Sequence, residues 1–126
     1  MGTEHFRRLE AMYATAPING FFQPQLEVGA GKAELRIVVR PEFFHSAHAV
    51  HGSVYFKALD DAAFFAANSL VEDVFVLTAS FNLHLLRPIT SGTMIATGTV
   101  VHQSRSQILA ESVLVDENGK QLARGS

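Results

Sequence analysis

The stretch His51–Ser69, HGSVYFKALDDAAFFAANS, decides the fold that this sequence predicts. It contains no proline and no glycine after Gly52, and alanine with other apolar residues makes up most of it. These are the properties of a helix interior, so we predict one long helix over residues 50–70. A helix this apolar needs other elements to cover it.

Segments with strand character flank this helix on both sides. We predict two short strands before it, at residues 25–28 and 33–39, and four after it, at residues 75–85, 93–102, 108–115 and 121–126. An amphipathic helix over residues 3–16, with Thr3 as N-cap and Pro17 as its stop, comes first. The fold class is therefore α+β, with an antiparallel sheet that wraps the long central helix and ends in a meander.

Length and composition limit the organisation and the partners. We expect one domain over residues 1–126, since this is the length of an ordinary domain. A formal net charge of -2 without blocks of like charge argues against a nucleic-acid partner. The chain has no cysteine, and its opening residues resemble neither a signal peptide nor a membrane span. We expect a cytoplasmic protein without a membrane partner, and a homodimer that hides the apolar surface of the sheet and helix.

Two adjacent aspartates, Asp60 and Asp61, stand in the middle of the predicted helix. Neighbours on a helix point about 100° apart, so the two carboxyl groups have different surroundings. Asp61 follows Lys57 by one turn, on a polar strip. Asp60 lies among apolar residues: Phe56, Ala63, Phe64 and Ala67. A desolvated carboxylate is costly unless it is hydrogen-bonded or protonated, so Asp60 is a candidate functional group, although a backbone N–H or a distant arginine could also satisfy it.

The start of the helix is a second candidate site. Gly52 allows a ligand to approach the backbone, and the N–H groups of the first turn are unpaired at the positive end of the helix dipole. Such a helix end can hold a carbonyl oxygen that becomes negative during a reaction. The same glycine could instead simply ease a turn.

Metal and serine chemistry find less support. His45, His48 and His51 are evenly spaced in HSAHAVH, but carboxylates are scarce around them and no HExxH pattern occurs. No GxSxG pattern marks a serine nucleophile. We expect neither a metal nor a cofactor.

These residues resemble the hotdog-fold acyl-CoA thioesterases, and among them the phenylacetate-pathway (PaaI-like) type, over residues 41–124. The family pattern is HGG, six residues, an aspartate, and a helix of small residues that ends in Asn-Ser. The sequence matches this pattern at His51, Gly52, Asp60, Asn68 and Ser69. FNLHLLRPITSGT, residues 81–93, is similar to the strand, Arg-Pro turn and glycine of the family. The resemblance implies a hotdog fold.

The resemblance also implies roles for individual residues. Asp60 would be the catalytic carboxylate, as general base on a water or as nucleophile. Gly52 and the backbone N–H of Ser53, in the second glycine position of HGG, would polarise the thioester carbonyl. Thr78 falls where some relatives orient the water, and His45 takes the place of an asparagine that helps to hold the carbonyl. An imidazole donates only in a suitable tautomer, so this last departure could alter the rate.

The substrate that the resemblance implies is an acyl-CoA thioester, hydrolysed to free acid and CoA at a subunit interface. The helix start of one chain would meet Asp60 of the other, in a homodimer or a dimer of dimers. Arg105 falls where relatives carry a basic residue near the CoA phosphates, and we expect His51, Phe56 and Phe64 to bind the substrate as well. The acyl group stays open, because phenylalanines at helical spacing are also ordinary core residues.

Three alternatives to hydrolysis by Asp60 stay open. One is a non-catalytic module that binds acyl-CoA or another acyl ligand on the same fold. Another is a hotdog dehydratase or hydratase, although no matching Asp/His or Glu/His arrangement is found. The third is a metal-dependent hydrolase that uses His45, His48 and His51.

Overall fold

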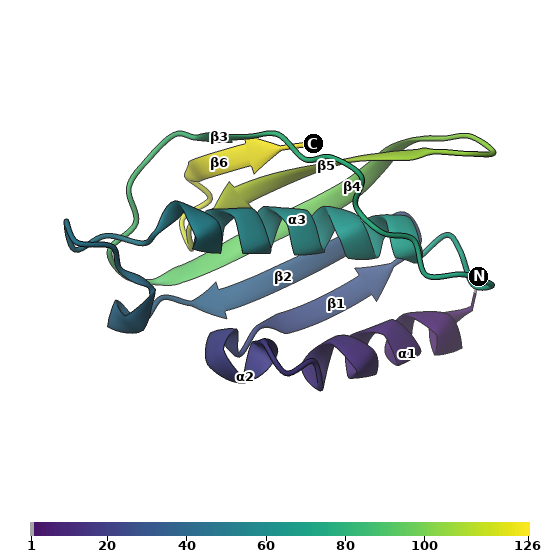
Figure 1. Ribbon diagram of the computed structural model, residues 1–126, viewed down its shortest axis with the longest axis horizontal. Helices are drawn as coiled ribbons and strands as arrows, with labels where there is room; N and C mark the ends of the chain where they lie inside the picture. The colour runs from purple at the N-terminus through teal and green to yellow at the C-terminus, as the bar shows by residue number, and fades with distance from the viewer. Residues whose placement is uncertain (1) are drawn as a thin grey trace.

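A long helix, α3 (Gly52–Asn68), lies across one face of an antiparallel sheet in the computed structural model, which describes residues 2–126 (Figure 1). The six strands are β1 (Gln25–Gly29), β2 (Lys32–Val38), β3 (Leu83–Leu85), β4 (Thr93–Gln103), β5 (Ile108–Val115) and β6 (Gln121–Gly125). Their order across the sheet is β1-β2-β4-β5-β6-β3. The α+β class with its long central helix is confirmed.

The N-terminal region differs in detail from the prediction. Helix α1 (Thr3–Ala14) ends two residues early, and its N-cap is Gly2 rather than Thr3, without a side-chain cap. The following segment contains a short helix α2 (Asn19–Phe22), which was not predicted, and a 3-10 turn (Pro41–Phe43) precedes α3. No helix of residues 2–126 is long and apolar enough to cross a membrane.

The prediction of a strand over residues 75–85 is largely wrong. Only Leu83–Leu85 form a strand, and β3 pairs with β6 rather than with β4, so the last four strands do not form a simple meander. Because β3 is an edge strand, one side of its backbone has no neighbour in the sheet. Residues 75–82 lie outside any strand and run along α3 instead.

The opposite edge of the sheet is covered by α1. Figure 1 shows α1 beside β1, at the far side of the sheet from β3. The Arg7 Nη2 group donates to the Val28 carbonyl at 3.0 Å, and the Val28 N–H donates to Glu10 Oε2 at 2.7 Å. Arg7 and Glu10 also pair with each other at 3.0 Å. Two side chains therefore occupy the backbone groups of Val28 that a further strand would use.

The helix approaches the sheet most closely at Gly98 in β4. A Cβ at Gly98 would meet the helix backbone at Ala62 and Ala63, only 2.6 Å from the Ala63 nitrogen. Ser112, the β5 residue opposite Gly98, donates its hydroxyl to the Leu59 carbonyl at 2.8 Å. Leu59 belongs to the same hydrophobic core as the fully buried side chains of the sheet: Leu35, Ile37, Met94 and Leu114. The missing side chain and the Ser112 bond together seat α3 on the sheet.

We predict that Gly98→Ala lowers the free energy of unfolding by about 1 to 3 kcal/mol or more, because the added methyl forces α3 away from the sheet. Gly29→Ala in β1 is the matched control, since a Cβ there meets nothing within 4 Å. Chemical denaturation of both variants measures the difference. Equal stability of Gly98→Ala and Gly29→Ala would show that the close contact does not constrain the helix.

Candidate active site

The two aspartates face opposite flanks of α3, as the helical geometry predicts. Asp61 Oδ2 accepts hydrogen bonds from the Tyr13 hydroxyl at 2.6 Å and from Lys57 Nζ at 2.8 Å. The side chains of Lys57 and Asp61 are only 12% and 19% exposed, and the Lys57 ammonium lies near the rings of Tyr13 in α1 and Phe22 in α2. Burial, and then the charge of Asp61, raises the pKa of Tyr13, which keeps the phenol as a donor. Asp61 therefore ties α1 to α3.

Asp60 lies against the segment of residues 75–81, which follows the other flank of α3 in the reverse direction. Phe75 packs edge-on against Phe64, with ring centroids 5.1 Å apart, and Phe81 packs in the same way against Phe56 at 5.5 Å. Between these two pairs, the Thr78 hydroxyl donates to Asp60 Oδ1 at 2.9 Å. A regular strand would point residues 75 and 81 away from residue 78, so the irregular backbone is what brings all three to the helix.

The surroundings of Asp60 raise the pKa of its carboxyl. Burial between aromatic side chains is the largest cause, and the hydrogen bond from Thr78 opposes it. The negative charge of Asp61 raises the pKa further, and the positive charge of Lys57 lowers it. Lys57 comes three residues before Asp60 but gives its hydrogen bond to Asp61. Asp60 is thus a partly desolvated carboxyl with a raised pKa, which is a property that favours a general base.

The start of α3 offers a backbone donor at Gly52. The ring of His51 caps the helix, with its Nδ1 accepting the Ser53 N–H at 3.0 Å and lying 2.9 Å from the Ser53 hydroxyl. The N–H that the resemblance assigns to the substrate carbonyl is therefore held by His51. Among residues 2–126, the Gly52 N–H makes no hydrogen bond. Gly52, rather than Ser53, presents the open donor.

A hollow of about 300 Å³ lies beside this helix start. Its walls come from the loop before α3, from the first turn of α3, and from the end of β3 with the turn that follows: His45, Ala49, Val50, Gly52, Tyr55, Leu85, Leu86, Arg87 and Pro88. The Tyr55 hydroxyl donates to the Arg87 carbonyl at 2.7 Å and closes one side. The contribution of Leu85 and Leu86 was not predicted; the Arg-Pro turn after them is the one sequence signal for it.

His45 is fixed in one tautomer by the chain itself. The Ala47 N–H donates to His45 Nδ1 at 3.0 Å, so the neutral ring carries its proton on Nε2. The imidazole can then donate a hydrogen bond from Nε2. Its ring lies 6.5 Å from that of His51.

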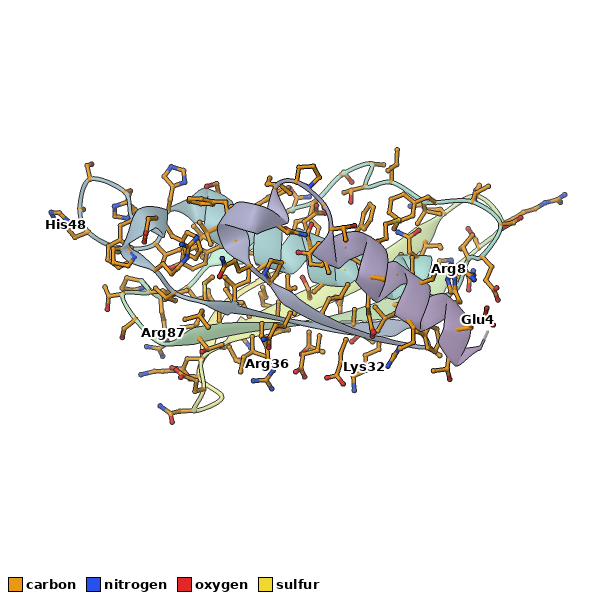
Figure 2. The ribbon with its side chains drawn as sticks, turned by 90° about the horizontal axis from the view of Figure 1, so that it is seen from below. Glu4, Arg8, Lys32, Arg36, His48 and Arg87 are labelled. Atoms are coloured by element: carbon orange, nitrogen blue, oxygen red, sulfur yellow. The ribbon has the colours of Figure 1, made fainter. Side chains whose placement is uncertain are left out.

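The expected site residues form three separate groups within one chain. His45, His51, Gly52 and Ser53 gather at the start of α3, and Phe56, Asp60, Phe64 and Thr78 gather along its flank. Figure 2 shows His48 and Arg87 at the end of the molecule away from Glu4 and Arg8. Arg105 lies in the β4–β5 turn, which projects at the end where α3 finishes (Figure 1). Residues 2–126 include no cluster of three or more His, Asp or Glu side chains arranged to hold a metal ion.

A family model of the thioesterase superfamily matches residues 47–123, which include the helix start, Asp60 and Thr78. The chain belongs to the thioesterase superfamily. A Mycobacterium tuberculosis protein named as an esterase is 31% identical over 103 residues, covering 79% of this chain and 74% of that protein. Membership of the superfamily supports thioester hydrolysis in general and makes this chain a hydrolase.

Solved structures of the superfamily have the same fold. The PaaI protein of the E. coli phenylacetic acid degradation operon superposes with a TM-score of 0.87 at 21% identity, over 97% of this chain and 88% of that one. The esterase structure from Mycobacterium tuberculosis gives a TM-score of 0.82 at 27% identity, over 87% and 91%. The hotdog fold is confirmed, and it is the fold of the PaaI protein.

We predict that Asp60→Asn makes the protein more stable at neutral pH. The pKa of Asp60 is raised in the folded state, so its ionised carboxyl opposes folding at neutral pH, and this cost disappears once the group is protonated in both states, below about pH 4. Thermal unfolding across a pH series should show a higher Tm for Asp60→Asn near pH 7 and a vanishing difference in acid.

The adjacent Asp61→Asn variant is the control for this stability experiment. It leaves the Lys57 ammonium and the Tyr13 hydroxyl with a poorer partner, so it should lower the free energy of unfolding by about 1 to 3 kcal/mol. If Asp60→Asn destabilised the protein as much as Asp61→Asn, the carboxyl of Asp60 would be a structural group.

Proposed function

We propose that this protein hydrolyses acyl-CoA thioesters to the free acid and CoA, with Asp60 as the general base. The observation that carries the proposal is the half-buried Asp60 carboxyl, which is held by Thr78 through one oxygen and has a raised pKa. The neighbouring Asp61 accepts hydrogen bonds from Tyr13 and Lys57, so its carboxylate is engaged in structural contacts.

In the proposed reaction Asp60 takes a proton from a water molecule as the water oxygen attacks the thioester carbonyl carbon. Thr78 holds Oδ1, which leaves Oδ2 to accept the proton. The carbonyl oxygen becomes negative and accepts hydrogen bonds from the Gly52 N–H and from His45 Nε2. When the intermediate collapses, the carbon–sulfur bond breaks, the protonated Asp60 gives its proton to the leaving CoA sulfur, and the acid and CoA are released.

Two copies of the chain are needed for this reaction. Gly52 and Asp60 are eight residues apart on one helix, which separates them by about 12 Å, too far to act on the same carbonyl. Exposed apolar side chains gather on residues 74–86, next to the free edge of β3: Val74, Phe75, Leu77, Leu85 and Leu86. A homodimer that covers this segment would bring Asp60 of one chain to the helix start of the other. Arg105 of either chain would reach toward the CoA phosphates in that assembly.

We predict that Asp60→Asn lowers kcat on a good acyl-CoA substrate by about 10²- to 10⁴-fold, because the water loses its general base. The measurement is a hydrolysis screen over short, medium, long and aryl acyl-CoAs. Asp61→Asn, assayed well below its Tm, should keep turnover per folded molecule. Unchanged turnover of Asp60→Asn would show that Asp60 is not the general base. CoA binding without hydrolysis by the wild type would favour a binding module.

We also predict that Gly52→Pro lowers kcat by about 10²- to 10³-fold, because it removes the open N–H donor. Proline suits the first position of a helix, and His51 before it has an extended conformation (φ -65°, ψ 144°) that proline tolerates. Gly52→Ala is the control: it keeps the N–H, and its Cβ makes an ordinary 3.5 Å contact with Leu85. Equal activity of Gly52→Pro and Gly52→Ala would show that the Gly52 N–H is not the donor to the carbonyl oxygen.

Coexpression of Asp60→Asn and Gly52→Pro chains tests where the site lies. If each site combines two chains, mixed dimers contain one intact site, and about a quarter of wild-type activity returns after random pairing. A site built within one chain would stay inactive in every pairing.

A further inference from the structure

Asn68, the last residue of α3, holds the segment that carries Thr78. Its Oδ1 accepts the Val76 N–H at 2.9 Å, and its Nδ2 donates to the Val76 carbonyl at 3.2 Å and to the Phe64 carbonyl at 3.0 Å. One amide therefore occupies both backbone groups of a single residue, as a neighbouring strand would. Asn68 is 1% exposed, so these bonds are shielded from water.

No other backbone hydrogen bonds hold this segment in the part of the chain that the structure describes. From residue 72 to residue 81, the N–H and C=O groups of Val76 are the ones that find protein partners, and both partners are on Asn68. The other contacts with α3 are the hydrogen bond from Thr78 to Asp60 itself and the aromatic pairs of Phe75 and Phe81, which resist sliding less than directed bonds do. The backbone of this segment is thus held to α3 by one side chain, that of Asn68.

Asn68 is itself held from two sides. Its carbonyl accepts hydrogen bonds from His5 Nε2 of α1 at 2.8 Å and from the Val71 N–H at 3.2 Å. The neighbouring Ser69 accepts the Gly31 N–H at 2.7 Å and donates to the Ala66 carbonyl at 2.6 Å. The end of α3 is therefore a fixed point from which the following residues are placed.

We propose that Asn68 is a positioning residue for the general base: by fixing Val76, it holds the Thr78 hydroxyl, two residues further on, against Asp60. The inference rests on the proposed function, since it assigns to Asn68 a part in orienting the Asp60 carboxyl. Without the Asn68 bonds, Thr78 moves off Oδ1 and Asp60 loses both its orientation and the hydrogen bond that lowers its pKa.

The variant that tests this is Asn68→Ser. A serine near the end of a helix can still bond the carbonyl four residues back, here that of Phe64, but it is too short to reach Val76. We expect kcat to fall roughly tenfold with little change in KM. The acidic limb of the kcat–pH profile should move to higher pH, because the carboxyl loses the bond from Thr78.

Thr78→Val provides the comparison, since it removes the same bond at an exposed position where folding is not at risk. It should shift the acidic limb in the same direction, and the Asn68→Ser/Thr78→Val double variant should be no slower than Thr78→Val alone. The described charged and titratable groups around Asp60 are Lys57 and Asp61 of α3 and Tyr13 of α1, and neither substitution changes them.

Ser69→Ala is the control for a purely structural effect. It removes buried hydrogen bonds from the same end of α3 without touching Val76, so it should lower Tm and leave the pH profile in place. A wild-type profile for Asn68→Ser, or kcat losses that multiply in the double variant, would overturn the inference. If Asp60→Asn keeps its turnover, the proposed function fails instead, whatever Asn68→Ser shows.

Discussion

The contact of α3 with Gly98 is the constraint on which the site depends. With no side chain at this position, the helix backbone lies directly on β4, and the Ser112 hydroxyl fixes the Leu59 carbonyl beside it. The helix can then neither roll nor rise from the sheet. Leu59 and Ala62 face the sheet, so the two residues between them point to opposite flanks of α3. Asp60 therefore lies on one flank and Asp61 on the other. The different surroundings of Asp60 and Asp61 thus depend on the absence of a side chain at Gly98 of β4.

The two flanks show how surroundings give different work to the same chemical group. Asp61 meets a phenol and an ammonium and becomes part of the connection between α1 and α3. Asp60 meets phenylalanine rings and one hydroxyl, which leave its carboxyl partly desolvated and its second oxygen open. Such a group opposes folding and can serve in catalysis. A carboxyl with hydrogen-bond partners, such as that of Asp61, stabilises the fold. A partly desolvated carboxyl, such as that of Asp60, destabilises it and is tolerated because the rest of the protein is stable enough.

Sequence reasoning succeeded where the signal is local and failed where it depends on distant partners. The composition of residues 51–69 was enough to predict the helix α3. Helical geometry alone predicted that Asp60 and Asp61 have different surroundings. The alternation in residues 75–85 indicated a strand, but a strand also needs a neighbour, and of these residues only Leu83–Leu85 pair with one, which is β6. The bond from Tyr13 to Asp61 spans 48 positions in the sequence, and the occupation of the Ser53 N–H by His51 depends on a ring orientation. No periodicity reports either of these.

The side chains that cover β1 also determine how copies of this sheet can combine. Arg7 and Glu10 saturate Val28, so strand addition is blocked on that side, while the other border, at β3, keeps unpaired backbone. We therefore expect two copies of this sheet to pair through β3 rather than through β1. By occupying Val28, the N-terminal helix therefore disfavours the addition of a further strand at β1, the protection that an exposed edge strand needs against open-ended association.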